Sequence, residues 1–440
     1  MKSVKRASSI PSGRTLVLRV SPLGEYSNSN KVINRFLNSY HNHFPDDTIV
    51  EKDISDGGLL KPYTAKRVMA KFSTWAGGKD AVEVAAQEEW RYTKELAEEF
   101  ASFHKVIIGS PTWNFSVANQ LKKYFDHIIQ PNLTFDPATL SGKLGHMSAL
   151  VVASAGSEIL GGPMDFNIPM VKSMLALMGI ADIRTIEVNG TANMDNLSTL
   201  LEAKYKEAEI LAEKFHHDPS AALYTGINRP RSESTETVPK GKKVLHVVSS
   251  PLGEWSASHS VAAKFLEEYK QKVPDSQVTT LDLTSDTPQP FNALRVQAKF
   301  ASFTNEELQG AAKEEWDYTL NLISDFKEYD TYVFSVPMWN WGLPSHLKLY
   351  IDHLVQPFQT FDPRDYSGLL SGKKAYVINS AGGPSLGGPF DVSSNYLTTV
   401  LGLMGIKDVS HVNVNGLSDQ TNRTGIIAEG TRNAIELLQQ

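Results

Sequence analysis

The hydrophobic and polar positions of the chain follow two alternating patterns. Short, nearly continuous apolar runs rich in β-branched residues, such as 15–20 and 105–110, are typical of strands buried on both faces. Longer stretches between them, such as 117–129, have the spacing of an amphipathic helix. Strands that alternate with helices in this way predict a parallel sheet covered by helices on both faces.

The first half of the chain predicts five strands separated by helices. We expect the strands over residues 15–20, 48–54, 105–110, 149–154 and 184–188. We expect the helices over residues 30–43, 80–103, 117–129, 164–178 and 197–215. Five strands in about 200 residues fit an α/β domain with a doubly wound, flavodoxin-like strand order.

The second half of the chain repeats the first. Ser21-Pro-Leu-Gly-Glu25 recurs as Ser250-Pro-Leu-Gly-Glu254, and Pro111-Thr-Trp-Asn114 recurs as Pro337-Met-Trp-Asn340. Matching strands are expected over residues 243–248, 278–283, 331–335, 375–379 and 410–414. A repeat of this length indicates two whole domains fused head to tail. We expect a flexible leader over 1–14, a first domain over 15–216, a polar, proline-containing linker over 217–242 and a second domain over 243–440.

Composition removes several classes of function. The 440 residues are 41% hydrophobic and 21% charged, so a packed core is expected. The absence of cysteine excludes disulfides, cysteine-ligated metal sites and thiol catalysis. A net charge of −6 disfavours nucleic acid as a partner, and no apolar run approaches the roughly 18 residues of a membrane span. No apolar stretch follows the basic leader as in a secretory signal, and we expect a cytoplasmic protein.

The loop after the first strand is a candidate phosphate site. Ligands of open α/β sheets bind at the carboxyl ends of the strands. Ser21, Ser27 and Ser29 lead into a helix, where free backbone N–H groups and hydroxyls suit a phosphate. The alternative, which this loop alone would favour, is a turn with a serine N-cap. Neither a G-x-G-x-x-G nor a P-loop pattern is present, so a ligand with a single phosphate is favoured.

Two further loops recur in both halves at the same predicted sheet edge. Pro111-Thr-Trp-Asn-Phe115 and Pro337-Met-Trp-Asn-Trp341 set aromatic rings around an amide, which suits a planar heteroaromatic ligand. Each Trp also fits a core position. Ser154-Ala-Gly-Ser157 and Ser380-Ala-Gly-Gly383 carry small residues that allow close backbone approach, or else form plain turns. The three loops together are more specific than any one of them.

With these motifs the chain resembles two fused copies of the FMN-dependent NADH-azoreductase, or NAD(P)H:quinone reductase, family of the flavodoxin-like fold. The resemblance covers residues 15–214 and 243–438 and is most specific over 111–126 and 337–352. It implies that the serine loop holds the FMN phosphate, that the aromatic loop contacts the isoalloxazine and that the small-residue loop borders the ring. The cofactor-binding residues that it implies are Ser21, Ser27, Asn28, Ser29, Thr112, Trp113, Asn114, Phe115, Ser154, Ala155 and Gly156 in the first half, and Ser250, Ser256, Ala257, Ser258, Met338, Trp339, Asn340, Trp341, Ser380, Ala381, Gly382 and Gly383 in the second.

The sequence departs from the family pattern at several positions. Ser157 stands where the pattern has its second glycine, and we expect its Cβ to crowd the flavin or to strain the backbone. Ala257 replaces the polar Asn28, so the two sites need not be equally occupied or active. Pro137 and Pro363 stand where many members have an aromatic residue, which changes the expected substrate-side wall.

The resemblance implies a two-electron, ping-pong oxidoreductase. In the family NADH or NADPH delivers hydride to flavin N5 and leaves, and a quinone, azo or nitroaromatic compound then takes the electrons. No catalytic side chain and no metal are therefore expected. Family members are typically homodimers with the flavin at the subunit interface, so this fusion is expected to form an intramolecular pseudo-dimer.

Two other functions stay open. A flavodoxin-type electron carrier with a protein partner would have a compact domain, whereas a long insertion over residues 56–103 and the duplication favour an enzyme. A hydrolase of the acyl-carrier type would need a nucleophile–base pair, and none is obvious. His127 and His353 recur on a predicted helix, where a structural hydrogen bond is the simpler interpretation.

Overall fold

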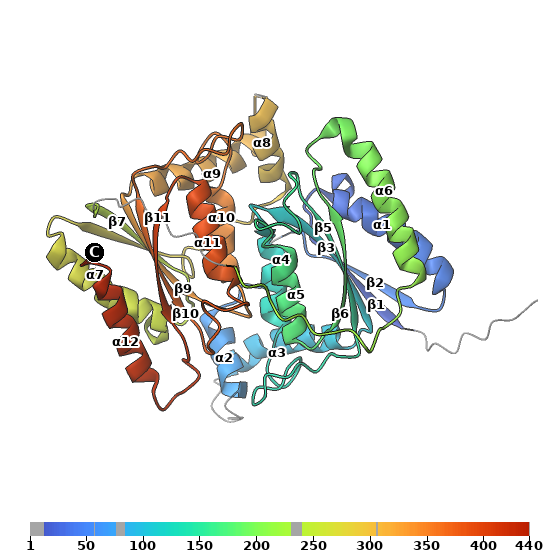
Figure 1. Cartoon of the computed structure of the whole chain (residues 1–440), viewed down its shortest axis with the longest axis horizontal. Coiled ribbons are helices and arrows are strands. Elements are labelled where there is room, and N and C mark those ends of the chain that lie inside the picture. The colour runs from blue at the N-terminus through green and yellow to red at the C-terminus, as the bar shows by residue number, and fades with distance from the viewer. Residues whose placement is uncertain (1–12, 57, 76–83, 230–239, 305–306, 440) are drawn as a thin grey trace, which may run out of the picture.

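The computed structural model describes residues 13–56, 58–75, 84–229, 240–304 and 307–439. Within them the chain forms two α/β halves, each built on one parallel sheet (Figure 1). The strand orders are β2-β1-β3-β5-β6 in the first half and β11-β10-β9-β7-β8 in the second. Both are the predicted flavodoxin-like order, in which ligands bind beyond the carboxyl ends of the strands where the order reverses.

The strands and helices of the two halves correspond to one another. The first half contains β1 (Arg14–Arg19), α1 (Asn28–His43), β2 (Thr48–Asp53), α2 (Ala65–Trp75), α3 (Val84–Ala101), β3 (Lys105–Trp113), β4 (Ser116–Val117), α4 (Asn119–Ile128), β5 (Ser148–Ser154), α5 (Ile168–Leu177), β6 (Asp182–Val188) and α6 (Met194–Glu213). The second half contains β7 (Lys243–Val248), α7 (Ala257–Lys272), β8 (Gln277–Asp282), α8 (Ala293–Thr304), α9 (Gly310–Lys327), β9 (Thr331–Pro337), α10 (Ser345–Leu354), β10 (Lys374–Ser380), α11 (Val392–Leu403), β11 (Asp408–Val414) and α12 (Arg423–Glu436).

All ten predicted strands are present, but two stretches of the first half differ from the prediction. The helix expected over 80–103 is described from Val84 onward, residues 80–83 lie outside the described residues, and α2 precedes it without having been predicted. The helix expected from residue 117 starts at Asn119, because β4 first returns antiparallel to the end of β3. This two-residue strand is added to the five predicted for that sheet.

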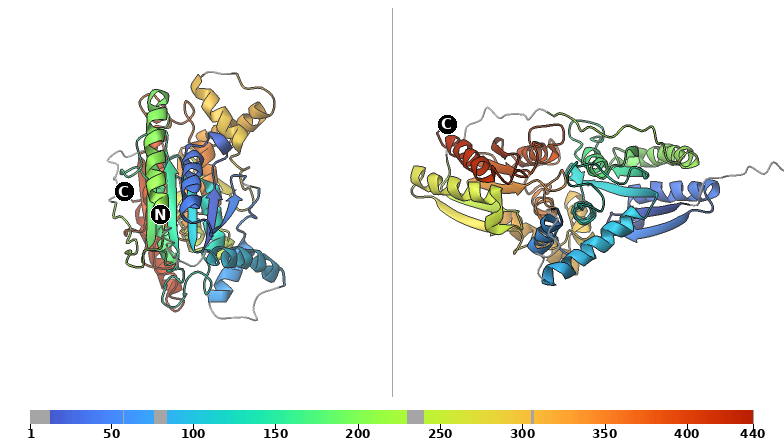
Figure 2. Two further views of the ribbon diagram at one scale, coloured as in Figure 1. Left: turned by 90° about the vertical axis from the view of Figure 1, so that its right-hand side faces the viewer. Right: turned by 90° about the horizontal axis from the view of Figure 1, so that it is seen from below.

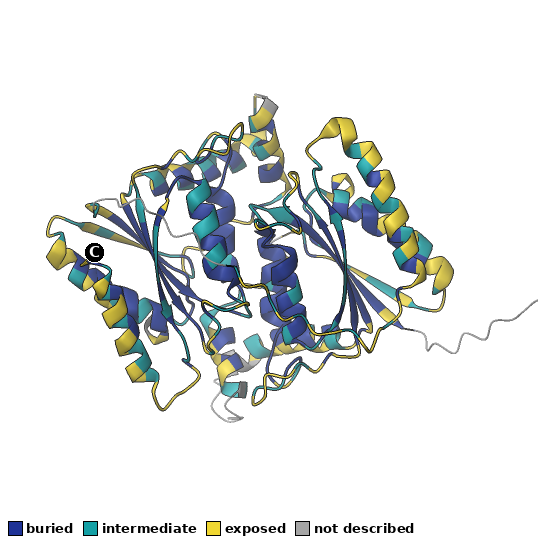
Figure 3. Cartoon of the chain, in the orientation of Figure 1, coloured by how far each residue is buried: buried dark blue, intermediate teal, exposed yellow. Residues whose placement is uncertain are grey.

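The inner helices of the two halves face each other. In Figure 1, α4, α5, α10 and α11 lie between the two sheets, whereas α1, α6, α7 and α12 lie on the outer faces. The view from below in Figure 2 shows the same arrangement of one sheet on each side of central helices. The inner helices are largely buried, and the outer helices expose one side to solvent (Figure 3).

One hydrophobic core runs from the first half into the second. It joins side chains of the inner layers, such as Phe125 and Met170 of the first half and Leu347 and Tyr396 of the second. The rings of Phe166 and Tyr396 meet edge to face across the boundary, with centroids 5.7 Å apart. This contact between the halves is apolar, unlike the more polar domain interfaces that allow relative motion.

Both predicted connecting segments are described only in part. Residues 1–12 of the expected leader and 230–239 of the expected linker lie outside the described residues, and Arg14 already belongs to β1. The described linker contacts both halves. The N–H of Ile227 donates to the carbonyl of Pro389 (3.0 Å), and Arg229 donates to the carbonyl of Pro163 (3.0 Å). None of the helices in the described ranges combines the length and apolarity needed to cross a membrane.

Candidate functional site

The three predicted loops leave neighbouring strands at one edge of each sheet. β1 pairs with β3 and β3 with β5, all parallel, so the loops that follow these strands begin side by side. Pro111 lies opposite Ser154 in this register. In the second half Pro337 lies opposite Ser380, whose carbonyl accepts the N–H of Met338 at 2.8 Å. Each half therefore brings its three groups of predicted residues to one sheet edge.

The serine loops have nearly identical geometry in the two halves. Ser27 caps α1 by accepting the N–H of Asn30 at 3.3 Å, and its hydroxyl lies 3.0 Å from that of Ser29. Ser256 caps α7 in the same way and lies 3.1 Å from the hydroxyl of Ser258. The N-cap interpretation is thus correct for both. It does not exclude an anion, because the cap satisfies only one of the free N–H groups of the first helical turn.

The first helical residue differs between the two loops. Asn28 is half-buried, and its side-chain oxygen is buried without a hydrogen-bond partner. The oxygen and nitrogen of an amide are told apart only by their surroundings. The Asn28 amide therefore leaves a hydrogen-bonding group unused at the start of α1, whichever of the two atoms stands there. Ala257 occupies the same position in the second half and is buried.

Each aromatic loop forms a hairpin tip in which two residues other than glycine have a positive φ. Asn114 and Phe115 have φ angles of +47° and +70°, and Asn340 and Trp341 have +48° and +63°. Positive φ at both tip residues defines a type I′ turn, whose second position normally holds glycine. A large side chain is disfavoured there by steric contact with its own backbone. Such outliers are concentrated at functional sites.

The two tryptophans face the opposite half of the chain. Trp113 is half-buried, and its ring centroid lies 6.2 Å from that of Phe291. Trp339 is buried 5.9 Å from Phe72, and its indole nitrogen has no hydrogen-bond partner. These rings therefore lie at the boundary between the halves, and not only in the core of their own half.

Ser157 does not strain the backbone. Neither Ser157 nor its counterpart Gly383 has a positive φ, so a Cβ is accepted at this position. The hydroxyl of Ser157 lies 3.1 Å from the phenol oxygen of Tyr366, which belongs to the second half. The expected backbone strain is therefore wrong, whereas crowding of the flavin by Ser157 stays a prediction. The loop after β5 also makes a contact with the other half.

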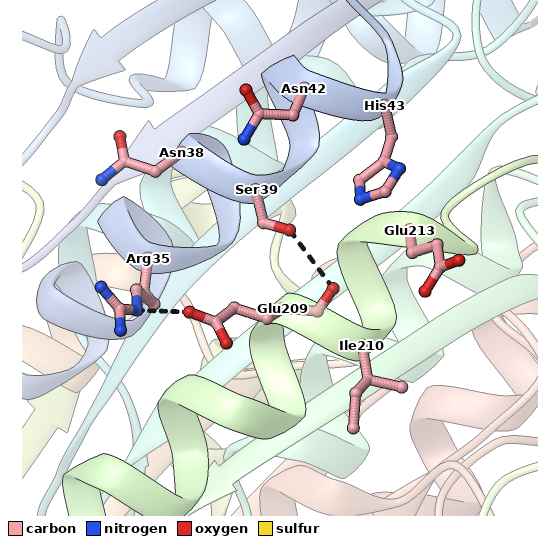
Figure 4. Close-up of a pocket in the computed structure, with 8 residues that line it drawn as sticks. All are labelled: Arg35, Asn38, Ser39, Asn42, His43, Glu209, Ile210 and Glu213. Carbon is pink, nitrogen blue, oxygen red and sulfur yellow. Dashed lines mark hydrogen bonds and ion pairs between the residues drawn. The ribbon is translucent and has the colours of Figure 1, made fainter. Parts of the chain in front are cut away.

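A cleft of about 830 Å³ opens beside the serine loop of the first half. One wall consists of residues 22–26, and the other is α8 of the second half, including Gln297 and Phe300. A second groove, of about 390 Å³, lies between α1 and α6 (Figure 4). It is lined by polar residues such as Arg35 and Glu209 and contains no predicted site residue. The first cleft is the one that adjoins the site.

His127 and His353 are held inside the fold. The Nε2–H of His127 donates to the carbonyl of Lys61 at 2.9 Å, and its Nδ1 lies 3.1 Å from the hydroxyl of Thr93. His353 has an equivalent pair of partners at 2.8 and 3.0 Å. Burial lowers the pKa of His127 to about 3 and that of His353 to about 4, so both rings are neutral at pH 7. These contacts agree with a structural role.

Charged residues outside the predicted set reach the hairpin tips. Asp352 accepts a hydrogen bond from Asn114, and Asp126 accepts one from Asn340, each at 3.0 Å. Lysines also reach the tips, and they too recur in both halves. The sequence signal that would have found these residues is the recurrence of Lys-x-x-x-Asp on the two helices that follow the aromatic loops.

Comparison with known proteins places both halves in one family. A sequence model described as flavodoxin-like fold matches residues 13–211 and 242–438. The FMN-dependent NADH:quinone oxidoreductase of Desulfotalea psychrophila is 31% identical over 206 residues, which are 45% of this chain and 97% of that relative. FMN-dependent NADH:quinone oxidoreductase 3 of Bacillus anthracis is 33% identical over 208 residues, 45% of this chain and 99% of the relative. A crystal structure of an azoreductase from Bacillus anthracis str. Sterne is 25% identical and covers 45% of this chain and 98% of its own, with a TM-score of 0.41. The chain therefore belongs, through both halves, to the flavodoxin-like fold family, and it is related over a whole domain to the FMN-dependent NADH:quinone oxidoreductases.

Proposed function

We propose that this chain is an FMN-dependent NAD(P)H oxidoreductase that reduces quinones, azo compounds or both by two-electron transfer. The observation that carries the proposal is the convergence, in each half, of a serine loop, an aromatic hairpin tip and a small-residue loop at one sheet edge. The relatives that match a whole domain bear names of this activity. FMN, when bound, supplies the hydride and electron transfer.

The residues present fit an FMN at each edge. In both halves a helix N-terminus with buried serine hydroxyls can hold a phosphate. In the first half, the unpaired amide of Asn28 also stands where such a ligand would complete its hydrogen bonding. The flat side chains at the hairpin tip suit the ring. We propose the 23 residues named above for the two FMN sites, with no catalytic side chain and no metal.

We also propose that the chain is an intramolecular pseudo-dimer with each site lined by both halves. The continuous inner core, the contact of Ser157 with Tyr366 and the packing of Trp113 against Phe291 support it. The domain limits proposed are those expected from the sequence, at residues 15–216 and 243–440. A cytoplasmic location is proposed because the donor, NADH or NADPH, is supplied there.

A turnover assay without any protein partner tests the activity. We expect the purified chain to oxidise NADH or NADPH when a simple quinone or an azo dye is added. Parallel lines in double-reciprocal plots are expected, because donor and acceptor use the same site in turn. Reduction that requires a second protein would instead support a flavodoxin-type electron carrier.

A further inference from the structure

The amide of each hairpin tip is used by the opposite half of the chain. The Nδ2 of Asn114 donates to Asp352 (3.0 Å), and its Oδ1 accepts from Lys299 (3.2 Å). Lys348 also donates to the carbonyl of Trp113 (3.3 Å). All three partners lie on α8 and α10 of the second half. Both polar atoms of the Asn114 side chain are therefore hydrogen-bonded to the second half.

The second hairpin tip repeats the two contacts of the amide, with the roles of the halves exchanged. Asn340 donates to Asp126 (3.0 Å) and accepts from Lys71 (2.8 Å), both in the first half. Asp126 is also paired with Lys122. We call Lys299, Lys348 and Asp352 cluster 1, and Lys71, Lys122 and Asp126 cluster 2. Each cluster lies in one half and holds the tip of the other.

Each cluster brings several ionisable groups together in a buried place. Each contains two lysines and one aspartate, and Lys122, Lys348, Asp126 and Asp352 are all buried. Lys71 is buried as well, and it also donates to the carbonyl of Ile129 at 2.9 Å. Burial lowers the pKa of Lys71 to about 7 and that of Lys299 to about 8, against the opposing effect of the nearby aspartate. Ionisable groups with pKa values shifted by burial are concentrated at functional sites.

The hairpin tips need support from outside their own loop. Phe115 and Trp341 adopt a left-handed backbone that their side chains disfavour, so a free loop would leave this conformation. Within each tip, the asparagine before the aromatic residue is fixed by charged groups on both sides of its amide. Hydrogen bonds to charged groups are the stronger kind, which suits them to this task.

We propose that the two clusters are positioning elements that act across the halves. Cluster 1 holds the first-half tip in its ring-binding conformation and favours the reduced state of the FMN bound there, and cluster 2 does the same for the second-half site. Lys299 and Lys71 are positioning residues because they act through the asparagine. The proposal rests on the proposed function, since it concerns the FMN sites named above.

The experiment isolates one site at a time in the full-length chain. Asn28→Glu places a carboxylate at the phosphate position of the first-half site, and Ala257→Glu does so in the second half. Lys299→Met and Lys71→Met are then compared in each background. FMN affinity is measured by quenching of flavin fluorescence, and the midpoint potential of the bound FMN is measured by dye equilibration.

The expected effects are assigned to the opposite half. With Ala257→Glu, where only the first-half site binds FMN, Lys299→Met is expected to raise the FMN Kd about tenfold and to lower the midpoint potential. Lys71→Met is expected to change that Kd by less than about twofold. With Asn28→Glu, where only the second-half site binds FMN, Lys71→Met is expected to raise the Kd and Lys299→Met to leave it nearly unchanged. A loss of positive charge lowers the potential because reduction adds electrons to the neighbouring group.

The outcomes separate this inference from the proposed function. The inference is overturned if a lysine substitution changes the FMN Kd of the site in its own half, changes both sites alike, or changes neither. In each of these cases FMN binding, and with it the proposed function, still stands. An unmodified chain that binds no FMN would overturn both. If a methionine variant loses its cooperative thermal unfolding, Lys299→Gln and Lys71→Gln, which retain a hydrogen-bond donor, replace the pair in the same comparison.

Discussion

Asn28→Glu is expected to reduce the bound flavin from two FMN per chain to one. The new carboxylate would stand at the first residue of α1, beside the hydroxyls of Ser27 and Ser29. At a separation of about 4 Å, repulsion from a phosphate is worth about 4 kcal/mol in surroundings of intermediate polarity, so affinity should fall by about 100-fold or more. Ala257→Glu is expected to remove the other FMN, and the double variant to bind none. Acid-released flavin per chain measures all three.

The chain supplies a matched control for this experiment. Asn28→Ala reproduces the residue that the second half carries at the same position, and we expect it to keep both FMN. A carboxylate at a helix start is favourable for the helix itself, so the Glu variants should retain their thermal stability. Equal loss of FMN in Asn28→Ala and Asn28→Glu would show that repulsion is not the cause.

Gly142→Ala is expected to lower the free energy of unfolding by about 3 kcal/mol. A Cβ on Gly142 would lie 1.9 Å from the backbone nitrogen of Gly179, where no flexible side chain can move aside. Gly179 cannot give way easily, because its φ is +89° and the neighbouring carbonyl of Met178 accepts the N–H of Leu144 at 2.8 Å. Urea unfolding monitored by circular dichroism gives the change in the free energy of unfolding.

A neighbouring glycine provides the control for the stability measurement. A Cβ on Gly145 would lie 3.6 Å from the nearest heavy atom, which is an ordinary contact. The second half carries Ser371 at this position, and it carries Gly368 where the first half has Gly142. Gly145→Ser should therefore change the stability by less than about 0.5 kcal/mol. Equal destabilisation by the two substitutions would contradict the close-packing argument.

The fold and the position of the site follow from local patterns in the sequence. Each strand is a short apolar run, and the order of strands and helices fixes which loops meet at the ligand edge. Duplication strengthens the prediction, because a motif that recurs as Pro111 and Pro337 before an aromatic loop is more specific than a single turn motif. The backbone strain expected at Ser157 is absent because the cost of a Cβ depends on φ, which a sequence pattern does not give.

The contacts between the halves lie beyond what the sequence pattern predicts. Lys71 and Asn340 are 269 residues apart, and their contact exists only once both halves are folded and packed. The same holds for α2, whose half-exposed Phe72 lies against Trp339 of the other half. The insertion that precedes β3 contains α2, which contacts Trp339 and Asn340 of the other half.

The most direct test of the account is the amount of FMN per chain in the purified protein. The visible spectrum of the protein is recorded, and the flavin is then released with acid and quantified. The mass of the particle is determined on the same sample. We predict two FMN in a particle of one 48.6 kDa chain, since both halves present the same three loops. A colourless protein that takes up no added FMN would contradict the account.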